Sequence, residues 1–149
     1  MFQVTASAES VAPPQAIWDL LEDPHNYEEL VPVTDRVLEA PAGGLHVGYE
    51  YREHGGIPPF KADSTWTVTE YKPNTRQVHV GDDGTMTMNL SIDITPTDGG
   101  CRLVQQLELT PRWYMVVPAW VMWHLLLRKR AQEAMQQTVE NISRTAETA

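Results

Sequence analysis

The sequence predicts an α+β fold in which a curved antiparallel sheet of seven strands surrounds one long C-terminal helix. Two observations lead to this prediction. Most of the chain consists of short segments in which apolar and polar residues alternate, separated by turns rich in Gly, Pro and Asp, which is typical of strands joined by hairpins. The last part of the chain instead repeats its apolar residues every three or four positions, which is the period of a helix.

The first part of the chain predicts one strand followed by two short helices. Residues 2–8 alternate as a half-buried strand does, and the Pro-Pro pair at 13–14 suits the first turn of a helix. The Asp-Pro pair at 23–24 ends that helix, and its Asp is placed to cap a second short helix that continues to Pro32.

Six more strands are predicted at 33–40, 45–53, 62–69, 76–80, 85–94 and 101–109. The clearest alternation is in the fifth of these segments, where one face carries Met86, Met88, Leu90, Ile92 and Ile94. In the other strands, His46 and His79 are expected to face outward. Short connections make the sheet an antiparallel meander with one apolar face, and such a face requires a cover.

The predicted cover is a helix over about 118–146. One stripe of this segment carries Trp120, Trp123, Leu127, Ala131, Ala134, Thr138 and Ile142. At 1.5 Å per residue the helix would be roughly 40 Å long, enough to cross a small sheet. No repeat or flexible linker divides the chain, so we interpret residues 1–149 as a single domain.

Composition and motifs disfavour several classes of function. The net charge of −9 opposes binding to nucleic acid, and the single cysteine, Cys101, allows neither an internal disulfide nor a cysteine-based zinc site. The five histidines lack metal-ligand spacing, and no Gly-rich phosphate loop or Gly-x-Ser-x-Gly motif is present, so we expect no metal and no cofactor. The opening MFQVTASAES lacks the features of a secretory signal, and we expect a cytoplasmic protein.

Several motifs resemble the polyketide cyclase/dehydrase and lipid-transport family of the START-like (SRPBCC) superfamily, whose fold is called helix-grip. The stretch ASAESVAPPQAIWDLLEDPHNYEELVP is similar to that family's opening, and VGYEY at 47–51 and DGGCRLVQQLEL at 98–109 look like its later strands. The matching positions of the opening are Trp18, Leu20, Leu21, Asp23, Tyr27 and Pro32. The Asp-x-x-x-Tyr-x-x-x-x-Pro stretch is also similar to the coenzyme-Q-binding branch, which implies a prenylated quinone ligand.

The resemblance implies an apolar cavity between the sheet and the C-terminal helix. From the strand and helix faces we expect its lining to include Tyr49, Tyr51, Trp66, Met86, Met88, Leu90, Trp120, Trp123 and Leu127, with Gln105 and His124 as polar members. Methionines and aromatic rings make an adaptable lining that suits a flat or flexible ligand. The first hypothesis is therefore binding or transport of a small lipophilic or aromatic ligand, such as a lipid, a quinone or a polyketide-like molecule.

Two other functions remain open at this point. One is a metal-free cyclase or dehydratase acting on an aromatic or polyketide substrate, with His124, Tyr49 and Tyr51 as candidate catalytic residues. The aromatase/cyclase relatives use several polar and basic groups, and no matching Arg/His/Tyr cluster is found in this sequence. The other is a protein-interaction module, which would have a closed core and a large exposed apolar patch near 113–125.

The stretch WYMVVPAWVMWHLLL at 113–127 is almost entirely apolar and is followed by three basic residues at 128–130. It is too short to cross a bilayer, and Pro118 interrupts it. The simplest interpretation places it at the start of the long helix, with one side in the mouth of the cavity. A helix that is apolar on all sides must cover its second side, so peripheral membrane contact or a homodimer through residues 113–125 is the alternative.

Overall fold

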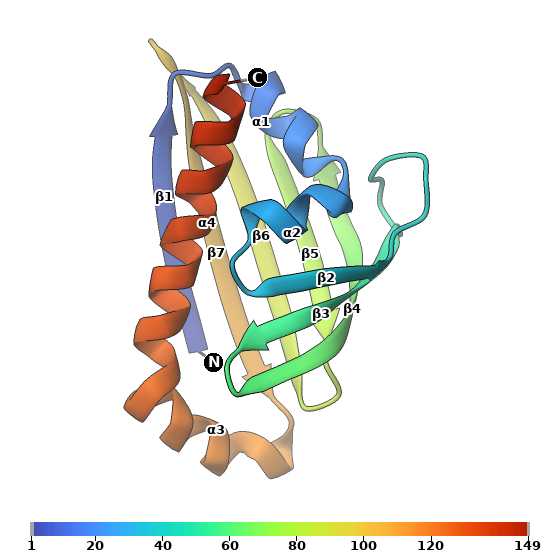
Figure 1. Cartoon of the computed structure of the whole chain (residues 1–149), viewed down its shortest axis with the longest axis vertical. Helices are drawn as coiled ribbons and strands as arrows, with labels where there is room; N and C mark the ends of the chain where they lie inside the picture. Colours follow the sequence, from blue (N-terminus) through green and yellow to red (C-terminus); the bar gives the residue numbers. More distant parts are fainter. Residues whose placement is uncertain (1, 149) are drawn as a thin grey trace.

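The computed structural model describes residues 2–148 and arranges them as seven antiparallel strands curved around a long C-terminal helix (Figure 1). The strands are β1 (Phe2–Ser10), β2 (Thr34–Glu39), β3 (Glu50–Ile57), β4 (Phe60–Lys72), β5 (Arg76–Asp82), β6 (Met86–Thr97) and β7 (Gly100–Pro111). Their order across the sheet is β1-β7-β6-β5-β4-β3-β2. The predicted α+β helix-grip class, with its meander of hairpins, is therefore confirmed.

Two short helical segments follow β1, as predicted. They are α1 (Pro14–Leu21) and a 3-10 turn, η1 (Pro24–Asn26), which continues into α2 (Tyr27–Leu30). The side chain of Asp23 accepts a hydrogen bond from the backbone N–H of His25 at 3.0 Å and so caps the second segment. Both segments cross the concave side of the sheet near the C-terminal end of the long helix (Figure 1).

The C-terminal helical region begins earlier than predicted and is bent. It consists of a 3-10 turn, η2 (Trp113–Met115), then α3 (Val116–Met122), a π-helical turn, η3 (Trp123–Leu127), and α4 (Arg128–Thr148). A π-helical turn is a common cause of a helix bend, and here α3 turns across the end of the sheet while α4 runs alongside it (Figure 1). Among residues 2–148, no helix combines the length and apolarity needed to cross a lipid bilayer.

Side chains of α4 cover the free edge of β1. Gln132 and Gln136 donate from Nε2 to the carbonyl oxygens of Thr5 and Ser7 at 2.8 and 3.0 Å, and the Ser143 hydroxyl donates to the carbonyl of Glu9 at 3.2 Å. These three bonds satisfy backbone acceptors that an edge strand leaves unpaired. The side of α4 that faces away from solvent is buried among core residues and includes Ala131, Met135, Val139, Ile142 and Ala146.

The region 45–57 differs from its predicted structure. Residues 45–49 form a loop, in which Val47 is exposed and Gly48 has a φ of +91°, so β3 begins only at Glu50. Conversely, β3 continues through Gly55, which was expected in a loop. A Cβ at Gly55 would lie 1.9 Å from the carbonyl oxygen of Val33, so only glycine permits this close approach of two strands.

Candidate functional site

A cavity of about 370 Å³ lies between the concave face of the sheet and the C-terminal helices. This volume falls in the range of about 300–1,000 Å³ that is usual for small-molecule sites. One end is closed by Leu21, Tyr27 and Leu30 from α1 and α2. The other end is closed by the last residue of η2, Met115, and by Pro118, Ala119 and Met122 of α3.

The structure brings most of the predicted lining together around this cavity. The predicted residues that line it are Tyr51, Trp66, Met86, Met88, Leu90, Gln105, Trp123 and Leu127. Aromatic rings form one wall, where the rings of Tyr51 and Trp66 are nearly parallel, with an interplanar angle of 8°. Tyr27 meets Tyr51 edge-on at a centroid distance of 5.8 Å. A protein-interaction module was expected to have a closed core, but the space between sheet and helix contains this cavity.

Tyr49, Trp120 and His124 do not line the cavity. Tyr49 lies in the loop before β3, buried, and its hydroxyl donates to the carbonyl oxygen of Pro41 at 2.5 Å. Trp120 and His124 lie on the outer side of the helical bend, where both are exposed and their rings are 4.6 Å apart. Ala119 takes the inward position in α3, and successive helical residues are rotated by about 100°, which turns Trp120 outward.

The structure shows a buried chain of polar side chains that the alternation of the strands did not predict. The hydroxyl of Tyr51 lies 2.8 Å from Nδ1 of His79, and Nε2 of His79 lies 2.8 Å from Oε1 of Gln77. Because a carbonyl oxygen only accepts, Nε2 of His79 carries the proton and Nδ1 accepts the Tyr51 O–H. Burial lowers the pKa of His79 to about 4, so the ring is neutral at pH 7.

The prediction that His79 faces outward is therefore wrong. His79 is 1% exposed and lines the cavity, because β5 turns Gln77, His79 and Gly81 inward. Gly81 pairs with Trp66 on β4, and a Cβ there would lie 2.7 Å from the indole, so the indole rests directly on the backbone of β5. The alternation of residues 76–80 gave no signal for this, because one of the two partners of His79, Tyr51, comes from a different strand, β3.

Glu53 is the ionisable group of the cavity that titrates near neutral pH. It is two residues beyond Tyr51 on β3 and therefore shares the inward face, and it lines the cavity. Burial raises the pKa of its carboxyl from 4.5 to about 7, although the Thr34 hydroxyl donates to Oε2 at 3.3 Å. The alternation that places Tyr51 inward also contains the signal for Glu53, because the two residues are two positions apart.

Gln105 supplies a buried amide that faces the cavity. The residue is 3% exposed and lines the cavity, and none of the side-chain hydrogen bonds within residues 2–148 involves it. Its amide nitrogen and oxygen are not among the fully enclosed side-chain atoms that lack a partner, so they reach the open space of the cavity and are available to a bound molecule or to water. Together with Tyr51 and Glu53, it gives an otherwise apolar cavity a small set of polar contacts.

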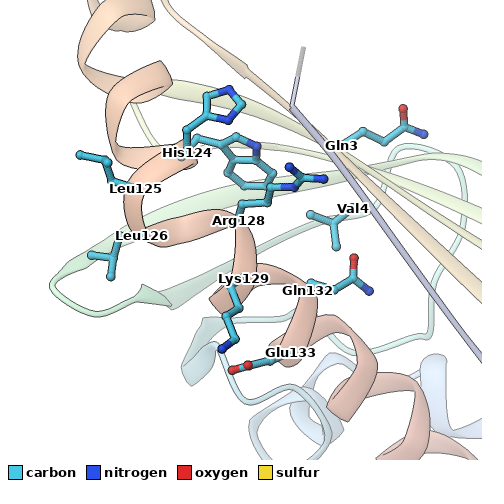
Figure 2. Close-up of a pocket in the computed structure, with 10 residues that line it drawn as sticks. Gln3, Val4, His124, Leu125, Leu126, Arg128, Lys129, Gln132 and Glu133 are labelled. Atoms are coloured by element: carbon cyan, nitrogen blue, oxygen red, sulfur yellow. The ribbon is translucent and has the colours of Figure 1, made fainter.

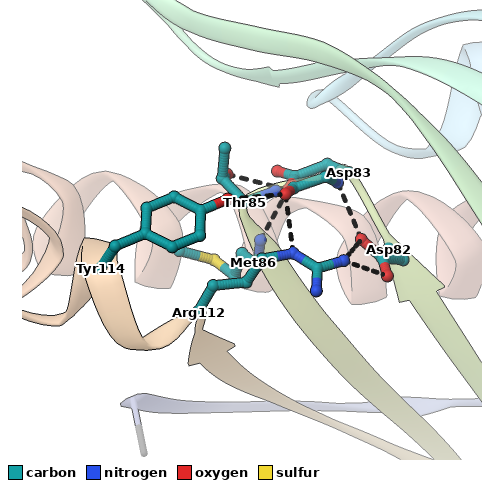
Figure 3. Close-up of polar contacts among 7 residues, drawn as sticks. Asp82, Asp83, Thr85, Met86, Arg112 and Tyr114 are labelled. Carbon is teal, nitrogen blue, oxygen red and sulfur yellow. Dashed lines mark hydrogen bonds and ion pairs between the residues drawn. The ribbon is translucent and has the colours of Figure 1, made fainter.

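A network of polar contacts fixes the start of α3 to the turn between β5 and β6 (Figure 3). Nη2 of Arg112 contacts both carboxylate oxygens of Asp82, at 3.2 and 2.9 Å, and its Nε donates to the carbonyl of Gly84 at 2.7 Å. Asp83 organises the same turn by accepting from the backbone N–H groups of Thr85 and Met86. The end wall of the cavity is thus tied to the sheet on one side and continues into α4 on the other.

Comparison with known proteins gives one family and a set of structural neighbours. The model of the family described as polyketide cyclase / dehydrase and lipid transport matches residues 1–147. No curated protein matches the chain. A solved protein from Thermus thermophilus is 15% identical, with a TM-score of 0.79 over 99% of this chain and 98% of its own. A protein from Chromobacterium violaceum is 18% identical, with a TM-score of 0.73 over 97% of both chains.

A further neighbour is StfQ, a di-domain ARO/CYC protein from the steffimycin biosynthetic pathway. It is 11% identical, with a TM-score of 0.77 over 98% of this chain and 50% of StfQ. At these identities the structural neighbours show the shared fold.

Proposed function

The chain belongs to the polyketide cyclase/dehydrase and lipid transport family, and we propose that it binds or carries a small lipophilic or aromatic ligand in the cavity between sheet and helix. The observation that carries this proposal is the cavity of about 370 Å³, whose lining is apolar apart from a few polar side chains. The amide of Gln105 is one of these polar groups. A site that is mostly apolar, with few directed polar groups, is the usual design for ligands of this class.

The lining also indicates the chemistry of the ligand. The parallel rings of Tyr51 and Trp66 favour a flat group, and the side chains of Met86 and Met88 adapt to irregular or flexible ones. Gln105 offers both a donor and an acceptor, which suits a carbonyl or hydroxyl oxygen. A lipid tail, a quinone and a polyketide-like aromatic molecule each combine these features, and we propose this class of ligand.

Native mass spectrometry of the purified protein, followed by extraction into organic solvent, tests the proposal. We expect a bound molecule of this class, or saturable uptake of an added fluorescent probe, 1-anilinonaphthalene-8-sulfonate. Met88→Trp fills the cavity from the inward face of β6 and should abolish uptake, whereas Thr87→Trp adds the same side chain on the exposed face and should not. Equal uptake by both variants would place the probe outside the cavity and contradict the proposal.

A second candidate function is a cyclase- or dehydratase-type enzyme, because Tyr51, His79 and Glu53 line the cavity and Gln77 holds the His79 ring from behind. A carboxyl group with a pKa of about 7 exchanges protons readily at neutral pH, and a hydroxyl held by His79 can contact a substrate oxygen. The similarity in fold to StfQ supports this candidate.

The enzyme candidate is tested with an aromatic β-hydroxyketone, 4-hydroxy-4-phenylbutan-2-one. Loss of water from this compound gives a conjugated enone whose absorbance is followed directly. We expect Tyr51→Phe and Glu53→Gln to lower any catalysed rate about 100-fold while the compound still binds. Tyr49→Phe is the matched control, because Tyr49 lies outside the cavity. No rate above the buffer reaction in the unmodified protein would leave ligand binding as the function.

A further inference from the structure

The helix α3 has two apolar faces, and only one of them faces the protein. Its inner face carries Pro118, Ala119 and Met122 and, together with Met115 of η2, forms the end wall of the cavity. The outer side of α3 and of the turns that flank it, η2 and η3, carries exposed apolar side chains at helical spacing, which we call the outer α3 face and which are Trp113, Tyr114, Val117, Trp120, Val121 and Leu125. Trp113, Val117 and Leu125 are 87%, 72% and 78% exposed. A soluble surface rarely exposes so many large apolar residues together unless they meet a partner.

The residue types on this face favour a lipid–water interface. Trp and Tyr are enriched where one end of a side chain is apolar and the other is wet, and the face carries Trp113, Tyr114 and Trp120. Aliphatic side chains lie between them at helical spacing. A helix with this composition, lying parallel to a membrane surface, buries its outer side in the boundary between headgroups and acyl chains.

Charge next to the face is complementary to an anionic surface. Arg128, Lys129 and Arg130 follow the π-helical turn directly, and no ion pair of these residues is found within residues 2–148. The chain as a whole has a net charge of −9, so a run of three cations is a local exception. Such a run beside an apolar helix attracts anionic lipid headgroups.

Two of these cations border a groove on the outer side of the helical bend (Figure 2). His124, Arg128 and Lys129 line it, together with Gln3 and Gln132. Glu133 is the acidic residue of the groove and lies one turn after Lys129. Donor groups therefore outnumber acceptor groups in a hollow that adjoins Leu125, which is the arrangement a phosphate headgroup would need beside an inserted side chain.

We propose that the outer α3 face docks on an anionic phospholipid bilayer, with Trp113, Val117 and Leu125 inserted and Arg128 and Lys129 at the headgroups. This docking proposal rests on the proposed function, because docking would serve the uptake of a lipophilic ligand. It would place the end wall of the cavity against the lipid bilayer, in which such a ligand dissolves. A second copy of the chain fits the same face less well, because a symmetric dimer would bring the two sets of cations close together.

Vesicle co-sedimentation tests the proposal, with vesicles of phosphatidylcholine alone and of equal parts phosphatidylcholine and phosphatidylglycerol. We expect binding to the anionic vesicles that weakens with added salt, and a blue shift of tryptophan emission on binding. Val117→Ser combined with Leu125→Ser should weaken binding by about tenfold or more. The matched control combines Val11→Ser with Val47→Ser, which removes equally exposed apolar side chains far from α3.

A second pair of variants isolates the charges. Arg128→Gln with Lys129→Gln should weaken binding to anionic vesicles roughly 25-fold, since each cation near an anionic surface contributes about fivefold. Arg36→Gln with Arg102→Gln removes the same charge from exposed positions on β2 and β7 and should have a much smaller effect.

The possible results separate this proposal from its alternatives. Absence of binding to anionic vesicles, or equal binding by the outer-face and control variants, would overturn it. A dimer in sedimentation velocity that V117S/L125S dissolves, without vesicle binding, would assign the face to a second copy instead. Uptake of 1-anilinonaphthalene-8-sulfonate by the protein without vesicles reports on the cavity separately, so failure of the ligand proposal and failure of docking give different results.

Discussion

The substitution Glu53→Gln should stabilise the folded protein at alkaline pH and leave it nearly unchanged at acid pH. Glu53 has a pKa of about 7 in the folded protein because it is buried, against 4.5 for the free side chain. The folded state therefore binds more protons than the unfolded state between these two values, and stability falls as the pH rises through this window. At about 1.4 kcal/mol per pH unit, the ionised carboxyl costs roughly 3 kcal/mol above pH 7. Glutamine has a similar shape, never ionises, and keeps an acceptor for the Thr34 hydroxyl.

Urea unfolding of the unmodified protein and the variant, from pH 4 to pH 9, measures this effect. The gain in unfolding free energy should be close to zero at pH 4 and should approach its full value by pH 8. Glu50→Gln is the matched control, because Glu50 is an exposed residue of the same strand. A Glu53 variant no more stable than the unmodified protein at pH 8 would show that the Glu53 carboxyl is hydrated, contrary to its burial in the cavity.

The same titration exposes the contribution of His79. Burial lowers the pKa of His79 from 6.5 to about 4, so the unfolded state binds more protons in this window and stability is lost as the pH falls from 6.5 to 4. In the unmodified protein, Glu53 has the opposite slope between pH 4.5 and 6.5, and the two slopes nearly cancel. The Glu53→Gln variant should therefore lose about 3 kcal/mol on acidification from pH 6.5 to 4. A flat profile for the variant would show that His79 is hydrated.

Three further predictions follow from contacts in and around the cavity. Gln105→Leu should weaken ligand binding about tenfold, because it removes a donor and an acceptor that face the cavity, whereas Gln106→Leu on the other face of β7 should not. Gly81→Ala should lower the unfolding free energy by about 1–3 kcal/mol, because its Cβ would lie 2.7 Å from the Trp66 indole. Arg112→Gln should accelerate amide hydrogen exchange within residues 113–122 while exchange in β1 stays unchanged, because it removes the contacts to Asp82 and Gly84.

The architecture follows from the sequence because its determinants are local. Alternation over 85–94 identifies both β6 and its inward face, and the stripe from Ala131 to Ile142 identifies the inward face of α4. These patterns survive because each strand or helix repeats the same signal over many residues. The departures occur where one residue decides the geometry, as at Gly48, whose positive φ lies in the loop before β3, and at Gly55, where two backbones touch.

The polar part of the cavity was harder to predict because it depends on contacts between distant residues. His79 is buried because the Tyr51 hydroxyl and the Gln77 amide satisfy both of its ring nitrogens, and one of these partners comes from β3, 28 positions earlier in the chain. Alternation places every second residue of β5 on the same face. It does not say which of the two faces is inward, because both faces of β5 carry polar residues. The inward position of Glu53 could be predicted from that of Tyr51, two residues earlier in the same strand. Its raised pKa could not, because it depends on burial by several other elements.

The bend of the C-terminal helix connects the two proposals of ligand binding and membrane docking. A straight helix would lie entirely along the sheet and would present one face to the core and one polar face to solvent. The π-helical turn Trp123–Leu127 instead directs α3 across the end of the sheet, so that a single helix forms the wall of the cavity on one side and an apolar surface on the other. Because Arg112 fixes only the start of this helix and the bend lies at its other end, a force on the outer α3 face would act on the cavity wall directly. Vesicles should therefore change the rate at which a ligand enters, and the Arg112→Gln variant should show a faster entry rate with vesicles absent.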